Sequence, residues 1–172
     1  MDFEEELVRR PSKARVLEIV QVILEEPNHV KGLMHHYFKH TDRLGMMASW
    51  IVCYVARKNP SLIKRYYPKM LKHIKKDVHT GIKRNTIRIF EDVPIPEKIQ
   101  SELYEICLEF ISDTKSPMAV AAFSMTTALR IARPYPELRE ELKEILFLMD
   151  THGTSGFQYR RKKTLKELDS YS

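Results

Sequence analysis

The sequence predicts an all-α protein whose helix pairs stack into a right-handed α-α superhelix. Three observations support this prediction: a repeated apolar pattern, prolines placed regularly ahead of that pattern, and only 5 glycines in 172 residues. Turn-rich β-proteins need frequent glycine and proline clusters between short strands, and such clusters are missing here. The repeated pattern is the observation that predicts the fold class most directly.

Four prolines mark the repeat, at positions 27, 60, 96 and 136, and each stands just ahead of a strong helical pattern. Proline is favoured in the first turn of a helix, where its missing N–H removes no hydrogen bond. After each proline, apolar residues recur at i, i+4, i+7, i+8 and i+11, and Thr41 is the one polar exception. The four sets are Val30/Met34/Tyr37/Phe38/Thr41, Ile63/Tyr67/Met70/Leu71/Ile74, Ile99/Leu103/Ile106/Cys107/Phe110 and Leu138/Leu142/Ile145/Leu146/Met149.

A second helix is expected ahead of each of these four. Capping residues open the additional helices: Ser12, Asp42, His79 or Thr80, and Ser116 followed by Pro117. We predict helix starts near residues 12, 28, 42, 61, 79, 96, 117, 136 and 155. The chain is then one domain, residues 1–172, with four helix pairs and a closing helix capped by Ser155. The pairs cover approximately 12–40, 42–76, 79–113 and 117–150, and the closing helix covers 155–168.

Two finer expectations follow from the pattern. Pro68 lies inside the second helix of its pair and removes one backbone hydrogen bond, so a kink or broken turn is expected there. Residues on the repeating apolar stripes should be nearly inaccessible to solvent. These are Ile51, Ile87 or Ile89, Phe90, Leu103, Phe123, Leu142 and Leu146.

Helix pairs with a period of about 33–40 residues are typical of HEAT, armadillo and tetratricopeptide arrays. The variable period and the proline at each pair junction favour the HEAT or armadillo type. The segments Ala119–Leu129, Tyr135–Leu138, Leu142–Leu146 and Gly156–Lys166 resemble small HEAT-like proteins of Bacteroidetes bacteria. The resemblance is clearest over residues 42–168. It implies a stand-alone armadillo-type fold without an established activity or cofactor.

Some proteins of this kind carry an adenylosuccinate lyase label. We do not expect that activity, because the lyase is far longer and uses a mobile serine-rich catalytic loop that nothing in this sequence matches. No other catalytic residues are predicted. Cys53 and Cys107 lack a sequence context that would lower a thiol pKa, and Ser124 lies inside a helical pattern. The loop at 153–156 has two glycines but neither the strand nor the lysine of a phosphate-binding loop.

A metal site was considered for the helix after Pro27. His29, His36 and His40 share one helical face, and with Asp42 they could ligate zinc or nickel. The favoured interpretation is that this helix keeps its histidines on the solvent side, and there is no His-Glu-x-x-His motif. We therefore predict no bound metal.

The chain is expected to lie in the cytoplasm and not in a membrane. The longest charge-free runs, Leu44–Ala56 and Pro117–Leu129, are too short for the roughly 20 residues of a membrane span. The N-terminus carries four acidic residues where a secretory signal needs positive charge. Cys53 and Cys107 are expected to be reduced thiols in the core.

Charge is unevenly distributed along the chain, which has a net charge of +6. Residues 57–88 contain eleven lysines and arginines and one acidic residue, whereas residues 89–113 contain seven acidic residues and one lysine. Glu102, Glu105 and Glu109 are taken as a solvated helix face. The candidate binding residues are Arg65, Lys69, Lys72 and Lys76, spaced i, i+4, i+7 and i+11, with Arg84, Arg88, Arg160, Arg161, Lys162 and Lys163.

Two functions are compatible with this charge pattern. The first is a non-enzymatic adaptor that binds an acidic protein on a concave surface lined by the second helix of each pair. The alternative is a nucleic-acid-binding protein that uses the basic block 57–88. DNA alkylation-repair glycosylases are solenoids with a basic concave face, but Trp50, the single tryptophan, is predicted to be buried here. The acidic block favours the adaptor, and Tyr66 and Tyr67 favour nucleic acid. In a third interpretation the lysines only solubilise the helix.

Overall fold

The structure is a computed structural model that describes residues 1–8 and 12–171. Within these residues there are helices and loops but no strand, which confirms the all-α prediction.

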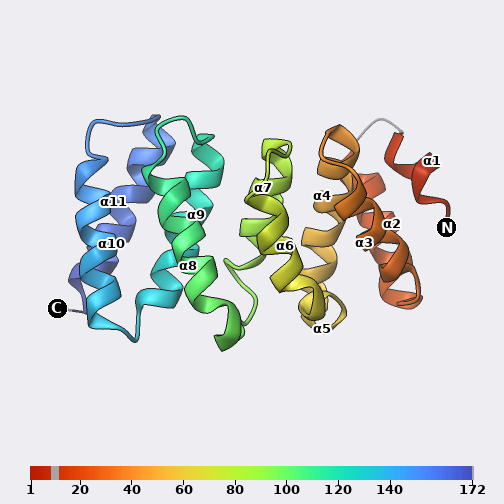
Figure 1. Ribbon diagram of the computed structural model, residues 1–172, viewed down its shortest axis with the longest axis horizontal. Helices are drawn as coiled ribbons and strands as arrows, with labels where there is room; N and C mark the ends of the chain where they lie inside the picture. The colour runs from red at the N-terminus through yellow and green to blue at the C-terminus, as the bar shows by residue number, and fades with distance from the viewer. Residues whose placement is uncertain (9–11, 172) are drawn as a thin grey trace. The chain divides into compact units, whose positions relative to one another are not determined.

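The chain divides into two compact units, Met1–Pro94 and Ile95–Ser172 (Figure 1). Unit 1 contains α1 (Phe3–Val8), α2 (Lys13–Glu25), α3 (His29–Lys39), α4 (Arg43–Lys58), α5 (Pro60–Ile63), the 3-10 turn η1 (Lys64–Tyr66), α6 (Tyr67–Ile74) and α7 (Thr80–Ile89). Unit 2 contains α8 (Glu97–Ser112), α9 (Met118–Ala132), α10 (Pro136–Leu148) and α11 (Ser155–Asp169).

The observed helix starts agree with the predicted ones to within one residue, and side-chain caps begin α2, α4, α7 and α11. Asp42 Oδ1 accepts a hydrogen bond from the Leu44 N–H at 2.9 Å, and the Ser12 hydroxyl caps α2 in the same way. Two predicted caps were wrong. The N-cap of α9 is Pro117, which makes no side-chain cap hydrogen bond, and not Ser116. The Thr154 hydroxyl, and not Ser155, accepts the Phe157 N–H at 3.3 Å and begins α11.

The break at Pro68 is confirmed. The second helix of its pair is divided into α5, η1 and α6, and the 3-10 turn ends just before Pro68. Proline has no N–H to donate to the carbonyl group four residues earlier, so the α-helical hydrogen-bond ladder cannot continue through it. The helix also ends at Ile74, so Lys76 lies in the loop that follows and not on the helix as predicted.

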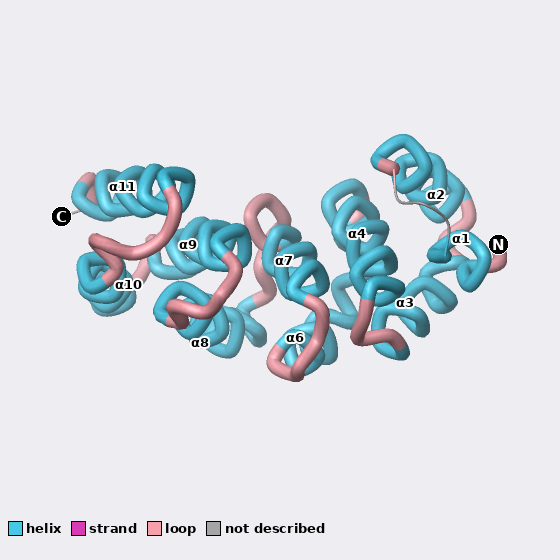
Figure 2. Tube along the Cα trace, turned by 90° about the horizontal axis from the view of Figure 1, so that it is seen from above, coloured by secondary structure: helices cyan, strands magenta, loops and turns pink. Residues whose placement is uncertain are grey.

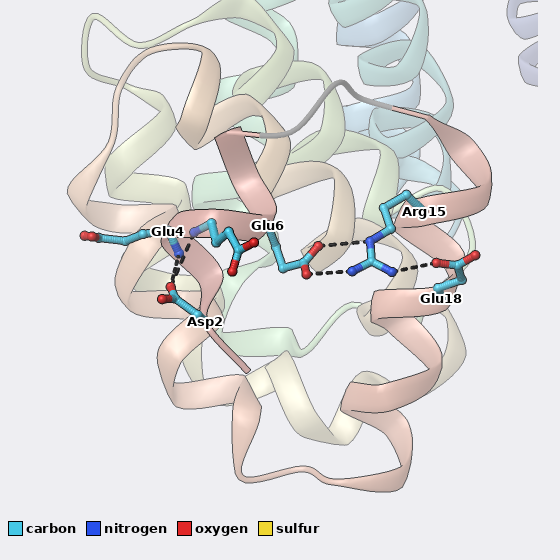
Figure 3. Close-up of polar contacts among 6 residues, drawn as sticks. Asp2, Glu4, Glu6, Arg15 and Glu18 are labelled. Atoms are coloured by element: carbon cyan, nitrogen blue, oxygen red, sulfur yellow. Dashed lines mark hydrogen bonds and ion pairs between the residues drawn. The ribbon is translucent and has the colours of Figure 1, made fainter.

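Helix α1 was not predicted. Its Phe3 side chain is buried and packs so closely on Gly32 of α3 that a Cβ atom there would lie 3.1 Å from the ring. Arg15 of α2 holds the same helix through Glu6, with two contacts of 2.6 and 2.9 Å, and also contacts Glu18 at 2.7 Å (Figure 3). A helix of six residues is too short to show an apolar period, which is why the sequence pattern did not reveal it.

Each unit consists of two helical layers (Figure 2). In unit 1, α2, α4 and α7 form one layer, and α1, α3 and α6 form the other. In unit 2, α9 and α11 form one layer, and α8 and α10 form the other. The single-domain organisation and the right-handed curvature concern how the two units combine, and both stay predictions.

The predicted core is confirmed at all positions but one. Ile51, Ile87, Ile89, Phe90, Leu103, Leu142 and Leu146 are each 0% exposed. Phe123 is only half-buried, and the prediction for it was wrong. The buried residues of α9 instead include Ser124 and Met125. Helix α9 packs against both α8 and α11, and small side chains such as that of Ser124 allow these helices to approach closely. Trp50 is also half-buried and not fully buried as expected.

Candidate binding surfaces

The four residues of the predicted basic stripe all lie in unit 1 and all are exposed, but they do not share one continuous helix. Lys69 and Lys72 lie on α6, Arg65 lies on η1, and Lys76 follows the end of α6. The break at Pro68 changes the helical phase between Arg65 and Lys69. The spacing i, i+4, i+7, i+11 therefore does not explain how these residues come together.

Aromatic side chains connect two of the four cations. Lys69 Nζ lies 4.3 Å from the centre of the Phe38 ring of α3, and the Arg65 guanidinium carbon lies 4.8 Å from the centre of the Tyr66 ring. Arg65 also donates a hydrogen bond to the Tyr66 hydroxyl at 2.7 Å. The centres of the Phe38 and Tyr66 rings are 6.5 Å apart, so α3, η1 and α6 present these cations and aromatic rings together. We call this set the basic surface: Phe38, Arg65, Tyr66, Lys69, Lys72 and Lys76.

The cations of the basic surface differ in their surroundings from the surface cations that are held by carboxylates. In the described part of the chain, none of Arg65, Lys69, Lys72 and Lys76 forms an ion pair with a carboxylate. Other cations do: the pairs include Arg15 with Glu6 and Glu18, Lys39 with Glu4, Arg57 with Asp92, Arg133 with Glu167 and Lys143 with Asp169. The positive charge of the basic surface is therefore directed to solvent.

His73 of α6 lies beneath the basic surface and is 5% exposed. Its ring is 5.6 Å from Phe38 and 5.3 Å from Tyr37. Burial lowers the pKa of His73 below 6.5, and the charges of Lys76 and Lys69 lower this pKa further. His73 is consequently neutral near pH 7, and its pKa reports the local positive field.

The remaining candidates do not join the basic surface. Arg84 and Arg88 lie on α7, in the other layer of unit 1, and both are half-buried. Arg84 donates to the side-chain oxygen of Asn85 at 3.4 Å, a neighbour on its own helix. These two arginines are one turn apart, as predicted, but on a different side of the unit from α6.

The basic run 160–163 on α11 does not form one surface. Arg161 is 4% exposed; its guanidinium donates to the Leu146 carbonyl and pairs with Asp150 at 2.8 Å. Arg160 is half-buried and donates to the Thr126 hydroxyl. Lys162 and Lys163 are exposed. Arg161 therefore stabilises the contact of α11 with α10 and is not available at the surface.

An acidic groove lies between α8 and α10 in unit 2, and the sequence interpretation missed it. Its volume is about 430 Å³. Tyr104 forms part of its wall and donates a hydrogen bond to the Leu138 carbonyl at 2.8 Å. Burial raises the pKa of Tyr104, and the charge of Glu141 raises it further. Glu105 is exposed, as expected for a solvated helix face, and it also lines this groove with Glu97, Glu137 and Glu141.

The groups that could carry chemistry are in unfavourable environments for it. Burial raises the pKa of Cys53 to about 11 and also raises that of Cys107, so both thiols stay protonated near pH 7. The expectation that the α3 histidines face solvent was wrong for His36, which is buried against Phe3 and whose pKa burial lowers. Within the described residues, no three histidine, cysteine, aspartate or glutamate side chains are grouped to hold a metal ion.

None of the described helices has both the length and the apolar composition that crossing a membrane requires. The chain matches the HEAT repeat domain family over residues 3–168, which includes every helix described above except the last residue of α11. The chain belongs to this family. As a HEAT repeat protein it has the stacked helix pairs that the proline-led repeat predicted. Comparisons with curated proteins and with solved structures gave no significant match.

Proposed function

We propose that this HEAT repeat protein is a non-enzymatic binding module that captures an acidic segment of a partner protein on the basic surface. The single observation that carries the proposal is the grouping of the exposed cations Arg65 and Lys69 with the rings of Tyr66 and Phe38, beside Lys72 and Lys76. A concentrated positive field attracts acidic partners and speeds their association. The adjoining rings of Phe38 and Tyr66 add contact area, which charge alone does not supply.

The charge balance of the chain supports a protein partner. Unit 1 has eighteen lysines and arginines against eleven acidic residues, a net charge of +7, and unit 2 has eleven against twelve, a net charge of −1. The positive excess is thus confined to one unit. The acidic groove of unit 2 would repel a phosphate backbone but offers an adaptor a second surface of opposite charge.

The environments of the thiols and histidines support a role without catalysis. Cys53 and Cys107 are buried and protonated near pH 7, whereas a nucleophilic cysteine needs a lowered pKa and access to substrate. Among the described residues, no carboxylate forms an ion pair with the buried histidines His36 and His73, whereas a carboxylate often orients a catalytic base. Binding is therefore the activity that the surface chemistry favours.

The experiment is a capture assay with a charge-reversed variant and a matched control. The variant carries Arg65→Glu, Lys69→Glu, Lys72→Glu and Lys76→Glu. The control carries Lys13→Glu, Lys98→Glu, Lys115→Glu and Lys166→Glu, four exposed lysines outside the basic surface. Both variants change the net charge by the same amount. We expect the control to retain the partners of the unmodified protein from a native lysate and the variant to lose them, with circular dichroism unchanged in both.

Nuclease treatment and salt distinguish the two partner classes. With a protein partner, capture by the unmodified protein should survive nuclease, and a rise in salt should weaken it only moderately. A nucleic-acid partner is the second candidate, favoured by Tyr66 beside Arg65, since bases stack on tyrosine. In that case nuclease should abolish capture, and the logarithm of affinity should fall linearly with the logarithm of salt concentration. If variant and control capture the same partners, the basic surface only solubilises the protein.

A further inference from the structure

We propose that the acidic groove of unit 2 binds an extended, basic segment of a partner protein, whose arginine or lysine side chains enter the groove. This site is separate from the basic surface and does not depend on the function proposed for that surface. The groove lies between α8 and α10, and its volume is about 430 Å³. Binding pockets in proteins measure about 300–1,000 Å³, so the groove is large enough to hold side chains of a partner.

Part of the groove lining is apolar, so the groove is more than a cluster of carboxylates. Ile131 is buried, and Leu108 and Leu138 are half-buried. Tyr104 is 4% exposed, and its hydrogen bond to the Leu138 carbonyl connects α8 to α10. Tyr135, which precedes α10, is 39% exposed. Arginine and lysine side chains place their aliphatic stems on such apolar surface while their charged ends stay among polar groups.

The charged part of the lining has one sign only. Four carboxylates line the groove, two from each helix, and all four are exposed: Glu97 and Glu105 of α8, and Glu137 and Glu141 of α10. Among the described lining residues there is no lysine or arginine. A bound cation would therefore meet carboxylates on both walls and aliphatic or aromatic side chains between them.

The nearby cations are directed to other contacts. On α10, Arg139 donates to the Arg133 carbonyl at 2.7 Å and lies over the Tyr171 ring, and Lys143 pairs with Asp169 of α11 at 2.6 Å. Helix α10 thus presents its glutamates to α8 and these two cations to the C-terminal part of the chain. Arg130 of α9 lines a separate, smaller pocket and not the acidic groove.

The spacing of the carboxylates favours a peptide segment over a single small cation. Glu97 and Glu105 are eight residues apart on α8, about 12 Å at the helical rise of 1.5 Å per residue. Glu137 and Glu141 are about 6 Å apart on α10 by the same rise. In an extended chain, side chains at i and i+2 point to the same side about 6.6 Å apart. Two basic residues separated by one other residue therefore match the row on α10.

The groove chemistry also distinguishes an organic cation from a metal ion. Within the residues that the structure describes, no three histidine, cysteine, aspartate or glutamate side chains are grouped to hold a metal ion. The exposed ring of Tyr135 can instead receive a guanidinium or ammonium group on its face, a contact that is available to organic cations. Guanidinium also forms bidentate hydrogen bonds with carboxylates, so arginine should bind more tightly than lysine.

The test is isothermal titration of the purified chain with two peptides of equal length at constant ionic strength. The first is acetyl-Ala-Arg-Ala-Arg-Ala-amide, and the second carries citrulline in place of both arginines, which keeps the shape and removes the charge. We expect the citrulline peptide to bind at least tenfold more weakly. N-acetyl-arginine amide, a single cation, should also bind more weakly than the arginine peptide.

Matched glutamates locate the site. Glu105→Gln and Glu141→Gln should each weaken binding of the arginine peptide roughly threefold. Glu109→Gln and Glu144→Gln, at exposed positions of the same helices that do not line the groove, should leave it unchanged. Tyr135→Leu changes no charge and should weaken binding about threefold through the lost aromatic face. Thermal unfolding checks the fold of each variant, and the two controls report any general effect of charge.

Four results would overturn the proposal. They are no heat of binding with the arginine peptide at about 1 mM, equal binding of the citrulline peptide, equal weakening by the lining and control glutamate variants, and equally tight binding of N-acetyl-arginine amide. The last result would assign the groove to a small organic cation. The variant with the four reversals on the basic surface should keep its preference for arginine over citrulline. Failure of one proposal is thereby distinguishable from failure of the other.

Discussion

The two basic runs of the chain, 64–76 in unit 1 and 160–163 in unit 2, look alike in sequence and differ in the structure. In the first run, Arg65, Lys69, Lys72 and Lys76 are all exposed and without carboxylate partners in the described chain. In the second run, Arg161 is buried, Arg160 and Lys163 line a groove between α9 and α11, and Lys162 is exposed outside that groove. Consecutive residues on a helix are about 100° apart, so a run of four cannot share one face. Charge density along a sequence therefore does not define a binding surface until the helical phase is known.

The largest expected effect tests the buried member of the second run. Arg161→Met should lower the free energy of unfolding by about 1.5–3 kcal/mol, because it removes charge-assisted hydrogen bonds to the Leu146 carbonyl and Asp150. Lys162→Met, at the exposed neighbouring position, should change it by less than about 0.5 kcal/mol. Urea denaturation monitored by circular dichroism measures both. Equal effects would show that Arg161 is not held in the core.

An intermediate effect is expected from acid, and it arises in unit 1. Burial lowers the pKa of His36 and of His73 in the folded chain, whereas in the unfolded chain both titrate near 6.5. The unfolded state then binds more protons below pH 6.5, so stability should be constant above that pH and fall as the pH drops through it. His73→Phe should reduce the fall in urea midpoint between pH 7.5 and 5.5, since phenylalanine can pack on Tyr37 and Phe38. An unchanged pH dependence would contradict the burial of a neutral His73.

The sequence predicted the fold of the helix pairs well because local signals determine it. Prolines and capping side chains fix where helices begin, and the apolar period identifies the buried face. Its failures also have local causes. Phe123 was assigned to the core of α9 by its hydrophobicity, but small residues such as Ser124 occupy the face where helices approach most closely. Helix α1 is too short for any period to appear.

The candidate sites were less predictable because they depend on contacts between distant residues. Phe38 joins the basic surface from α3, and no spacing within α6 could show that. The acidic groove requires the packing of α8 on α10, and the smaller groove lined by Thr126, Lys163 and Glu167 requires the register of α9 and α11. In each case the sequence identified one wall of the site, a charged helix face, and the second wall came from another helix of the same unit. The packing of neighbouring helices determines which charged faces meet. The repeat predicts that these helices pack together, but not which of their side chains come into contact.

The smallest expected effect measures the field of the basic surface directly. Besides burial, the charges of Lys76 and Lys69 lower the pKa of His73, and Lys72 makes no comparable contribution. Lys76→Gln should therefore raise the pKa of His73 toward 6.5. Lys72→Gln changes the charge by the same amount, two residues before the end of α6, and should leave this pKa nearly unchanged. NMR titration of the imidazole resonances measures these shifts. The effect of Lys76→Gln should shrink between 0.1 M and 1 M salt, because the Debye length falls from about 10 Å to about 3 Å. If Lys72→Gln shifts the His73 pKa as much as Lys76→Gln does, the field is a property of the whole of unit 1. The positive field at His73 would then come from the +7 net charge of unit 1 and not from the residues of the basic surface in particular.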